Sequence, residues 1–243
     1  MRVVATIEAR MRSTRLPGKV LMPILGKPIL ELMIERLRRV PKIDAIVIAT
    51  SDDPSNDPIE KLANHLGVGC YRGSEDDVLD RVLQAAQSVD GDLIVELTAD
   101  CPLIDPQLTT ETIDAFLAAK VDYAANCLRE PYPNGLDVQV FPTAILEEVA
   151  RLTNDPADHE HVSLYIYEHP ERFRILHVAA GPPEASHLRL TVDTAEDFAL
   201  VTRIFEALYP DDPAFGLPEI VALFLRQPEL RDLNARILQK PVR

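Results

Sequence analysis

Residues 3–20 read VVATIEARMRSTRLPGKV, an apolar run followed at once by a basic loop. Val3–Ile7 has the length and near-continuous apolar character of a strand buried on both faces. Pro17-Gly18 supplies a turn that can bring the end of the loop back toward its beginning. Four cations share this loop: Arg10, Arg12, Arg15 and Lys19. Because crowded cations repel one another, the loop is either a phosphate-binding loop or a basic turn screened by water.

The rest of the first half repeats this alternation. Apolar segments at 43–50, 68–71 and 92–98 are expected strands, and helices are expected from Pro28, near 58–66 and from about Asp76 to Ser88. Strands that alternate with helices indicate βαβ units with right-handed crossovers. We therefore predict an α/β fold with a mostly parallel sheet.

The pattern changes after residue 121. Expected strands at 122–126, 136–141 and 172–178 surround expected helices near 142–153 and 159–168. A strand at 188–192 and a helical segment from Thr194 to Leu238 follow. We predict one domain, with a core of 1–121 and 188–210, an inserted mixed region of about 122–187 for acceptor binding or dimerisation, and a helical tail of 211–243.

Charge and composition restrict the function. The chain of 243 residues has a formal net charge of −14, yet residues 1–30 contain six lysines and arginines against a single acidic residue, Glu8. An acidic body disfavours nucleic acid and membrane surfaces as partners, whereas a local basic pocket suits a small polyanion. Cys70, Cys101 and Cys127 have no metal-binding spacing and are expected to be reduced thiols in a cytoplasmic protein. No apolar stretch has the length of a signal peptide or membrane span.

The basic loop follows a strand at its carboxyl end, where open α/β sheets bind ligands. It lacks the glycines of a P-loop or of a G-x-G-x-x-G turn, so its positive charge comes from side chains, and arginine forks can take phosphate oxygens in pairs. Asp100 and Asp193 also follow expected strands, and both can face the same sheet edge and share a Mg²⁺ ion. The alternatives are a turn role for Asp100 and a helix cap at Asp193 or Thr194, with Glu196 or Asp197 completing a capping box.

Several motifs occur together in a familiar order. They are EARMRSTRLPGK (8–19), ATSDD (49–53), YRGSEDDVLDR (71–81), LTADCPLI (97–104), YPNGLDVQVF (132–141), HEHVSLYIYEHP (159–170) and RLTVDTAEDF (189–198). This set, spread over roughly residues 1–205, resembles the cytidylyltransferases that activate sugar acids, a group that contains the CMP-Kdo and CMP-sialic acid synthetases. It looks most like the relatives known from spore-coat polysaccharide synthesis.

The resemblance implies a Rossmann-like nucleotidyltransferase fold with helices on both faces of the sheet. It also implies a Mg²⁺-dependent reaction in which a sugar-acid hydroxyl attacks the α-phosphorus of CTP and releases pyrophosphate. Relatives form homodimers, so a homodimer is expected, although the apolar tail could equally pack within its own chain. CTP and a small acidic sugar are the expected partners.

The resemblance further assigns roles to individual residues. The nucleotide-binding set is Arg10, Ser13, Arg15, Lys19, Asp52 and Arg72; the catalytic set is Arg10, Arg15, Lys19 and Asp100. The metal ligands are Asp100 and Asp193, and the acceptor-binding set is Asn134, Asp137, Glu160 and His161. Asp52 can instead shape a turn, and Arg72 can instead form a surface ion pair. The Kdo enzymes carry Gln-Gly where this chain has Thr98-Ala99, which bears on base contacts and acceptor choice.

Two other functions compete with this one. A glycosyltransferase of related fold normally carries an Asp-x-Asp motif after a central strand, whereas LTADCPL has a single aspartate. A catalytically silent nucleotide-binding domain would be free to lose Arg10, Lys19, Asp100 or Asp193, and all four are present. A zinc site at His159-Glu160-His161 is disfavoured, because histidines at i and i+2 point away from each other on a helix.

Overall fold

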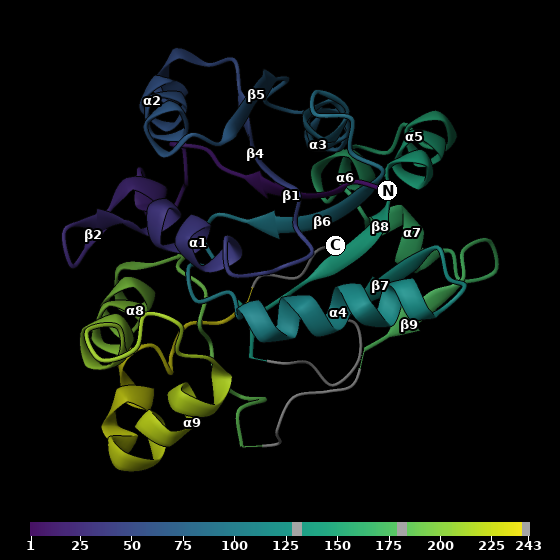
Figure 1. Ribbon diagram of the computed structural model, residues 1–243. Helices are drawn as coiled ribbons and strands as arrows, with labels where there is room; N and C mark the ends of the chain where they lie inside the picture. Colours follow the sequence, from purple (N-terminus) through teal and green to yellow (C-terminus); the bar gives the residue numbers. More distant parts are fainter. Residues whose placement is uncertain (128–132, 179–183, 240–243) are drawn as a thin grey trace.

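The computed structural model describes residues 1–127, 133–178 and 184–239. A seven-stranded sheet in the order β5-β4-β1-β6-β8-β7-β9 forms its centre (Figure 1). The strands are β1 (Val3–Glu8), β4 (Ala45–Ser51), β5 (Gly69–Gly73), β6 (Leu93–Thr98), β7 (Tyr123–Ala125), β8 (Gln139–Pro142) and β9 (Ile175–His177). β8 is antiparallel to both of its neighbours, and the other described pairings in this sheet are parallel. The mostly parallel α/β sheet is therefore confirmed.

Helices cover both faces of the sheet, as predicted. The helices α1 (Ile29–Leu37), α2 (Asp57–Leu66) and α4 (Pro106–Ala118) pack on one face, together with Val3, Ala5 and Ile7 of β1. On the opposite face, α3 (Val78–Gln87), α5 (Thr143–Leu152) and α7 (Leu164–Glu168) pack with Val4. Successive residues of β1 thus enter different cores, which explains why its sequence is a continuous apolar run rather than an alternating one.

A third apolar cluster joins the C-terminal helices to the first half of the chain. α8 (Ala195–Leu208) packs near the small hairpin of β2 (Pro23–Ile24) and β3 (Lys27–Pro28), and α9 (Leu217–Arg226) packs against α8 (Figure 1). A 3-10 segment, Pro228–Leu233, follows α9. Ile220, Leu223 and Phe224 of α9 are buried against the same chain. The tail predicted at 211–243 contains α9 and this 3-10 segment, and residues 240–243 lie outside the described residues. Most of the apolar face of α9 is used internally.

Two predicted elements were wrong. Residues 188–192 do not form a strand; Arg189 makes one isolated bridge with Asn134. The backbone N–H of Leu190 donates to Asn134 O (2.6 Å) and that of Val192 to Asp100 O (2.7 Å), so the segment ties two turns together across the strand ends instead of running beside one strand.

The predicted helix at 159–168 is divided into two. α6 (Pro156–Glu160) and α7 are separated by Val162, whose φ of 46° lies in the left-handed region and interrupts the helix. All three cysteines are free thiols, and none of the described helices combines the length and apolar character needed to cross a bilayer.

Candidate active site

A cavity of about 470 Å³ opens at the carboxyl ends of β1 and β6. These adjacent parallel strands lie where the strand order reverses, since β1 continues to β4 on one side and β6 lies on the other. Such a reversal is the usual ligand position in open α/β sheets. The predicted residues that line the cavity are Arg10, Ser13, Arg15, Lys19, Asp100, Glu160, His161 and Asp193.

The turn at Gly18 places Lys19 in this cavity. Gly18 has a φ of 72°, a conformation that favours glycine, and its N–H donates to Met11 O at 2.8 Å, which closes the loop. Lys19 then begins a 3-10 turn, Lys19–Leu21, whose Val20 enters the core. The lysine is only 8% exposed. The short helical turn therefore fixes the direction of the lysine side chain.

The ammonium group of Lys19 lies between the two aspartates predicted to bind metal. Its Nζ is 2.9 Å from Asp100 Oδ2 and 2.9 Å from Asp193 Oδ1. Thr98 Oγ1 donates to the other oxygen of Asp100 at 2.6 Å. Burial by itself would lower the pKa of Lys19, but the two carboxylates outweigh it and raise that pKa. Asp100 and Asp193 follow Lys19 by 81 and 174 positions in the sequence, and both contact its ammonium group.

Two arginines complete the environment of Asp193. Arg15 Nη2 is 2.9 Å and Arg189 Nη2 is 2.6 Å from Asp193 Oδ2. Burial would raise the pKa of Asp193, yet Lys19, Arg189 and Arg15 together hold it below its usual value. Sequence reasoning missed Arg189, although it lies four residues before Asp193 in the motif that points to this aspartate.

Asp193 does not cap the helix that follows it. Thr194 is the N-cap of α8: its Oγ1 accepts from Asp197 N at 3.3 Å, and Asp197 Oδ2 accepts from Thr194 N at 3.1 Å. Of the capping alternatives, the Thr194–Asp197 box is the one observed. The carboxylate of Asp193 is consequently available to the cavity.

The structure does not bring Asp52 or Arg72 into the cavity. Arg72 is drawn to the acidic first turn of α2, where its Nη1 is 2.7 Å from Asp57 Oδ1 and 2.7 Å from Glu60 Oε2. Its Nη2 also donates to Asp53 O at 2.9 Å. Asp52 is exposed in the turn after β4. In this structure Arg72 has the alternative role of an ion-pair partner and Asp52 that of a turn residue, and neither lines the cavity.

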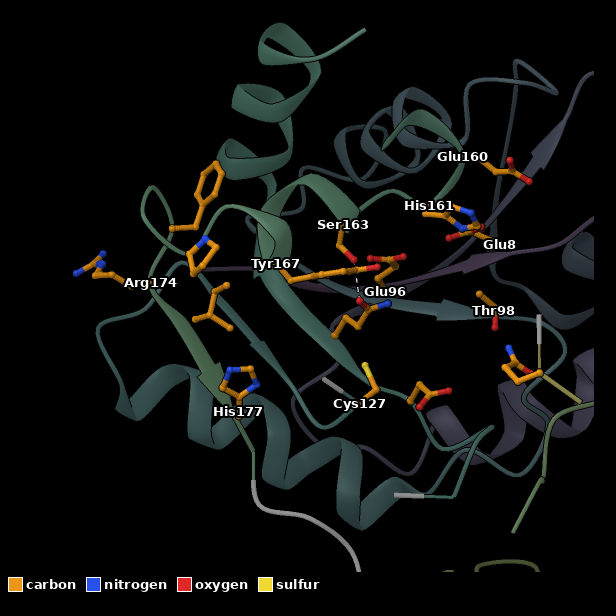
Figure 2. Close-up of a pocket in the computed structure, with 16 residues that line it drawn as sticks. Glu8, Glu96, Thr98, Cys127, Glu160, His161, Ser163, Tyr167, Arg174 and His177 are labelled. Atoms are coloured by element: carbon orange, nitrogen blue, oxygen red, sulfur yellow. Dashed lines mark hydrogen bonds between the residues drawn. The ribbon is translucent and has the colours of Figure 1, made fainter. Parts of the chain in front are cut away.

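A larger cavity of about 1010 Å³ adjoins the first and shares four lining residues with it: Glu8, Thr98, Glu160 and His161 (Figure 2). Asp137 also lines it, so three of the four predicted acceptor-binding residues meet here. Asn134 does not line either cavity. Its Nδ2 donates to Gln239 Oε1 at 2.8 Å, and its backbone O accepts from Leu190 N in the segment 188–192.

Two acidic residues in the larger cavity escaped sequence reasoning. Glu8 ends β1, and Glu96 lies in the middle of β6 with 4% exposure. Burial raises the pKa of Glu8 to about 7 and that of Glu96 well above its usual value. The available signal was the carboxylate of Glu96 inside an apolar strand, together with Glu8 at the end of another.

The residues of the first cavity fit a magnesium ion in part. Asp100 and Asp193 flank one point in space, and Mg²⁺ in proteins commonly uses one or two carboxylates together with phosphate oxygens and water. Within the part of the chain that the structure describes, no three His, Cys, Asp or Glu side chains gather as a metal site. His159, for example, contacts Asp77 (2.8 Å) and Thr153 O (3.1 Å) instead. Water or phosphate oxygens would therefore supply the remaining ligands.

Comparisons with known proteins agree with this geometry. The sequence matches the family profile described as cytidylyltransferase over residues 4–234. It is 34% identical to the spore coat polysaccharide biosynthesis protein SpsF of Bacillus subtilis, over 93% of this chain and 95% of that protein. It is 26% identical to a 3-deoxy-manno-octulosonate cytidylyltransferase of Geobacter metallireducens, over 88% and 94%. A solved cytidylyltransferase from Leptospira borgpetersenii, 30% identical, superposes with a TM-score of 0.91 over 99% of this chain and 100% of that one.

Proposed function

This chain belongs to the cytidylyltransferase family, and from that premise we propose that it transfers CMP from CTP to a sugar acid in a Mg²⁺-dependent reaction that releases pyrophosphate. The observation that carries the proposal is Lys19 held between Asp100 and Asp193 at the switch point of the sheet. The choice of a sugar acid rests on the name of the Geobacter relative, a 3-deoxy-manno-octulosonate cytidylyltransferase.

The basic loop supplies the groups that phosphoryl chemistry needs. Arg10, Arg15 and Ser13 line the smaller cavity and would hold the triphosphate of CTP. Lys19 would neutralise charge on the departing pyrophosphate, because its ammonium group is already directed into the cavity. These groups are fixed by the folded loop before any ligand arrives, which is the condition for electrostatic stabilisation of a transition state.

Mg²⁺ would be held by Asp100 and Asp193. When bound, it would supply positive charge that offsets the negative charge developing on the phosphates during transfer. Mg²⁺ and the ammonium group of Lys19 would compete for the same two carboxylates. Lys19 would therefore leave these carboxylates and pair with phosphate oxygens when Mg²⁺ binds.

The larger cavity would bind the acceptor. It joins the smaller one along Glu8, Thr98, Glu160 and His161, so an acceptor hydroxyl placed at this shared wall would face the nucleotide cavity. Asp137, Glu160 and His161 remain in the proposed acceptor set, whereas Asn134 is withdrawn because it does not line the cavity.

A homodimer is a further part of the proposal. Leu225 of α9 is 67% exposed and Leu238 is 83% exposed, whereas Leu223 and Phe224 of α9 are buried. These exposed apolar side chains are available to a second copy of the chain. Light scattering coupled to size-exclusion chromatography would measure the mass directly, and a mass of one chain at micromolar concentration would refute this part alone.

The decisive experiment measures pyrophosphate release with CTP, UTP, ATP or GTP against a panel of sugar acids and their amino analogues, with and without EDTA. Release that requires CTP, one class of acceptor and Mg²⁺ is expected. Release of free nucleotide from a nucleotide-sugar donor, with no pyrophosphate formed from CTP, would indicate a glycosyltransferase. Binding of CTP without any turnover across the panel would count against the sugar-acid assignment.

A further inference from the structure

Glu96 is a carboxylate buried at the wall of the acceptor cavity without a full set of partners. Its side chain is 4% exposed, and no side chain or backbone N–H of the described residues donates to its Oε2. The carboxyl group of Glu8 is close enough to share a hydrogen bond with Glu96, but only when one of the two glutamates is protonated. The neighbouring Ser163 donates instead to Gln139 Oε1 at 2.7 Å (Figure 2). A buried oxygen left without a donor is costly, so such an atom in a cavity wall points to a ligand that supplies the donor.

A second carboxylate increases the demand for a positive ligand. Glu8 lines the same cavity from the adjacent strand, and Figure 2 shows it beside His161. Glu8 also lines the smaller cavity. The β1–β6 register pairs Glu8 with Thr98 and Thr6 with Glu96, so the two glutamates lie two positions apart on one face of the sheet. Two buried carboxylates at this spacing cannot both ionise easily unless a cation joins them.

The positive groups described near this pair act on Glu8 rather than on Glu96: burial raises the pKa of Glu8, and Arg81 and Arg10 oppose that rise from the nucleotide side. His161 and His177 also line the larger cavity. Asp137 and Glu160 add two more carboxyl groups to the lining. Arg174 is engaged by Asp122, with contacts of 2.8 and 3.0 Å, is 64% exposed, and points away from the two glutamates in Figure 2. Arg81 lies on the nucleotide side, where it lines the smaller cavity.

The missing cation is better supplied by a ligand group than by a metal. Within the described residues no three ligating side chains converge, and a pair of glutamates alone is a poor cage for a hard cation. An ammonium group, in contrast, has three donors and one charge, which can satisfy Glu96 Oε2 and neutralise the pair at once.

We propose that the acceptor carries a free amino group, whose ammonium form is bound in this cavity by Glu96 and Glu8. The inference rests on the proposed function and specifies its substrate class as an amino-substituted sugar acid. The hydroxyl that attacks CTP would lie at the shared wall, and the ammonium group would lie against Glu96.

The protonation of the pair provides an independent signature. Burial raises the pKa of Glu8 to about 7, with Arg81 and Arg10 opposing the rise and Asp100 adding to it. Burial and the charge of Glu8 raise the pKa of Glu96 well above its usual value. Both shifts favour the protonated form of the pair, whereas an ammonium ligand favours the ionised form, so binding of an ammonium group should release protons.

The test compares two acceptors that differ only in the group of interest, 3-deoxy-manno-octulosonate and 8-amino-3,8-dideoxy-manno-octulosonate, together with the amine and N-acetyl forms of other sugar acids. Pyrophosphate release is measured for the wild type, Glu96→Gln and a matched control, Glu111→Gln, on the exposed side of α4. We expect the wild type and the control to favour free amines by a factor of about 10 to 100 in kcat/KM, the range of one charge-assisted hydrogen bond.

Glu96→Gln should remove the preference for free amines and keep turnover of the acceptors that carry a hydroxyl or N-acetyl group instead. A merely structural role of Glu96 would not change this ratio. Calorimetry of the amine acceptor in two buffers of different ionisation enthalpy should show proton release. Equal or better use of the hydroxyl and N-acetyl forms by the wild type would overturn the inference and leave the proposed function intact. Failure of every acceptor despite CTP binding would overturn both.

Discussion

Replacing Lys19 by methionine should make the stability of the protein depend on magnesium in the absence of nucleotide. The lysine side chain is 10% exposed, and its ammonium group is 2.9 Å from each of two carboxylates that are 24% and 13% exposed. Methionine keeps most of the side-chain volume and removes the charge. Asp100 and Asp193 would then face one another without the cation between them.

The size of the effect follows from the burial of the cluster. Removing one partner of a fully buried ion pair costs roughly 3–5 kcal/mol. Because the carboxylates retain some solvent and Asp193 keeps Arg15 and Arg189, a loss of about 2–3 kcal/mol is expected. For a chain of this length that corresponds to a fall of about 4–12 °C in Tm.

Thermal unfolding with and without Mg²⁺, at ionic strength matched with NaCl, measures the predicted rescue. A ligand at about 100 times its Kd stabilises the folded state by about 2.7 kcal/mol, enough to restore most of the loss. The wild type should gain much less, because Lys19 already occupies the space between the carboxylates. Lys42→Met is the matched control, since Lys42 pairs at 3.0 Å with Asp114, whose side chain is 54% exposed.

One outcome would refute the reasoning about the metal. If Mg²⁺ stabilised Lys19→Met no more than the wild type and the Lys42→Met control, Asp100 and Asp193 would not form a magnesium site. The ion pairs would then be structural, and the role of the two aspartates in turnover would need another explanation. This test needs neither CTP nor an identified acceptor.

Three further predictions concern single side chains. Asp193→Asn should reduce kcat by at least about a hundredfold and shift the Mg²⁺ titration to higher concentration, while helix α8 remains capped by Thr194; normal turnover would exclude a metal role. The free energy of unfolding in urea should fall as pH rises from about 4.5 to 7, because the folded state binds more protons than the unfolded state through Glu8 and Glu96. Glu96→Gln should make this fall smaller, and the same pH dependence in wild type and variant would contradict the raised pKa values. Arg72→Ala should leave kcat/KM for CTP within about twofold of wild type, as befits an ion pair outside the cavity, and a larger loss would restore its nucleotide-binding role.

The parallel half of the fold and the position of the site could be predicted because they follow from local patterns. Apolar runs such as Val3–Ile7 are characteristic of strands buried on both faces, and the two cores that flank β1 confirm this. The rule that ligands bind at the carboxyl ends of parallel strands then brought the basic loop and Asp100 to one edge. No contact had to be known for that step. Asp193 was placed there through a strand at 188–192 that the structure does not contain, so its position agrees with the structure although the reason given for it was wrong.

The errors arose where the outcome depends on distant partners. Residues 188–192 have the β-branched and apolar character of a strand, yet their backbone groups bond to the turns at Asn134 and Asp100. The sequence around Arg72 does not indicate that its guanidinium group will form ion pairs with Asp57 and Glu60 of α2. Such partners are set by tertiary packing, which a single sequence does not display.

The ion cluster around Asp193 has two parts with different exposure, and the difference separates scaffold from site. Asp197 is fully buried and is committed to the cap of α8, and Arg189, with a side chain 9% exposed, joins it to Asp193. Arg15 is 30% exposed and lines the cavity with Lys19. The inner pair can therefore hold Asp193 in place while the outer cations exchange a carboxylate for a phosphate. Because each exchange keeps every charge paired, the ligand-free ion pairs are compatible with a catalytic role for Arg15 and Lys19.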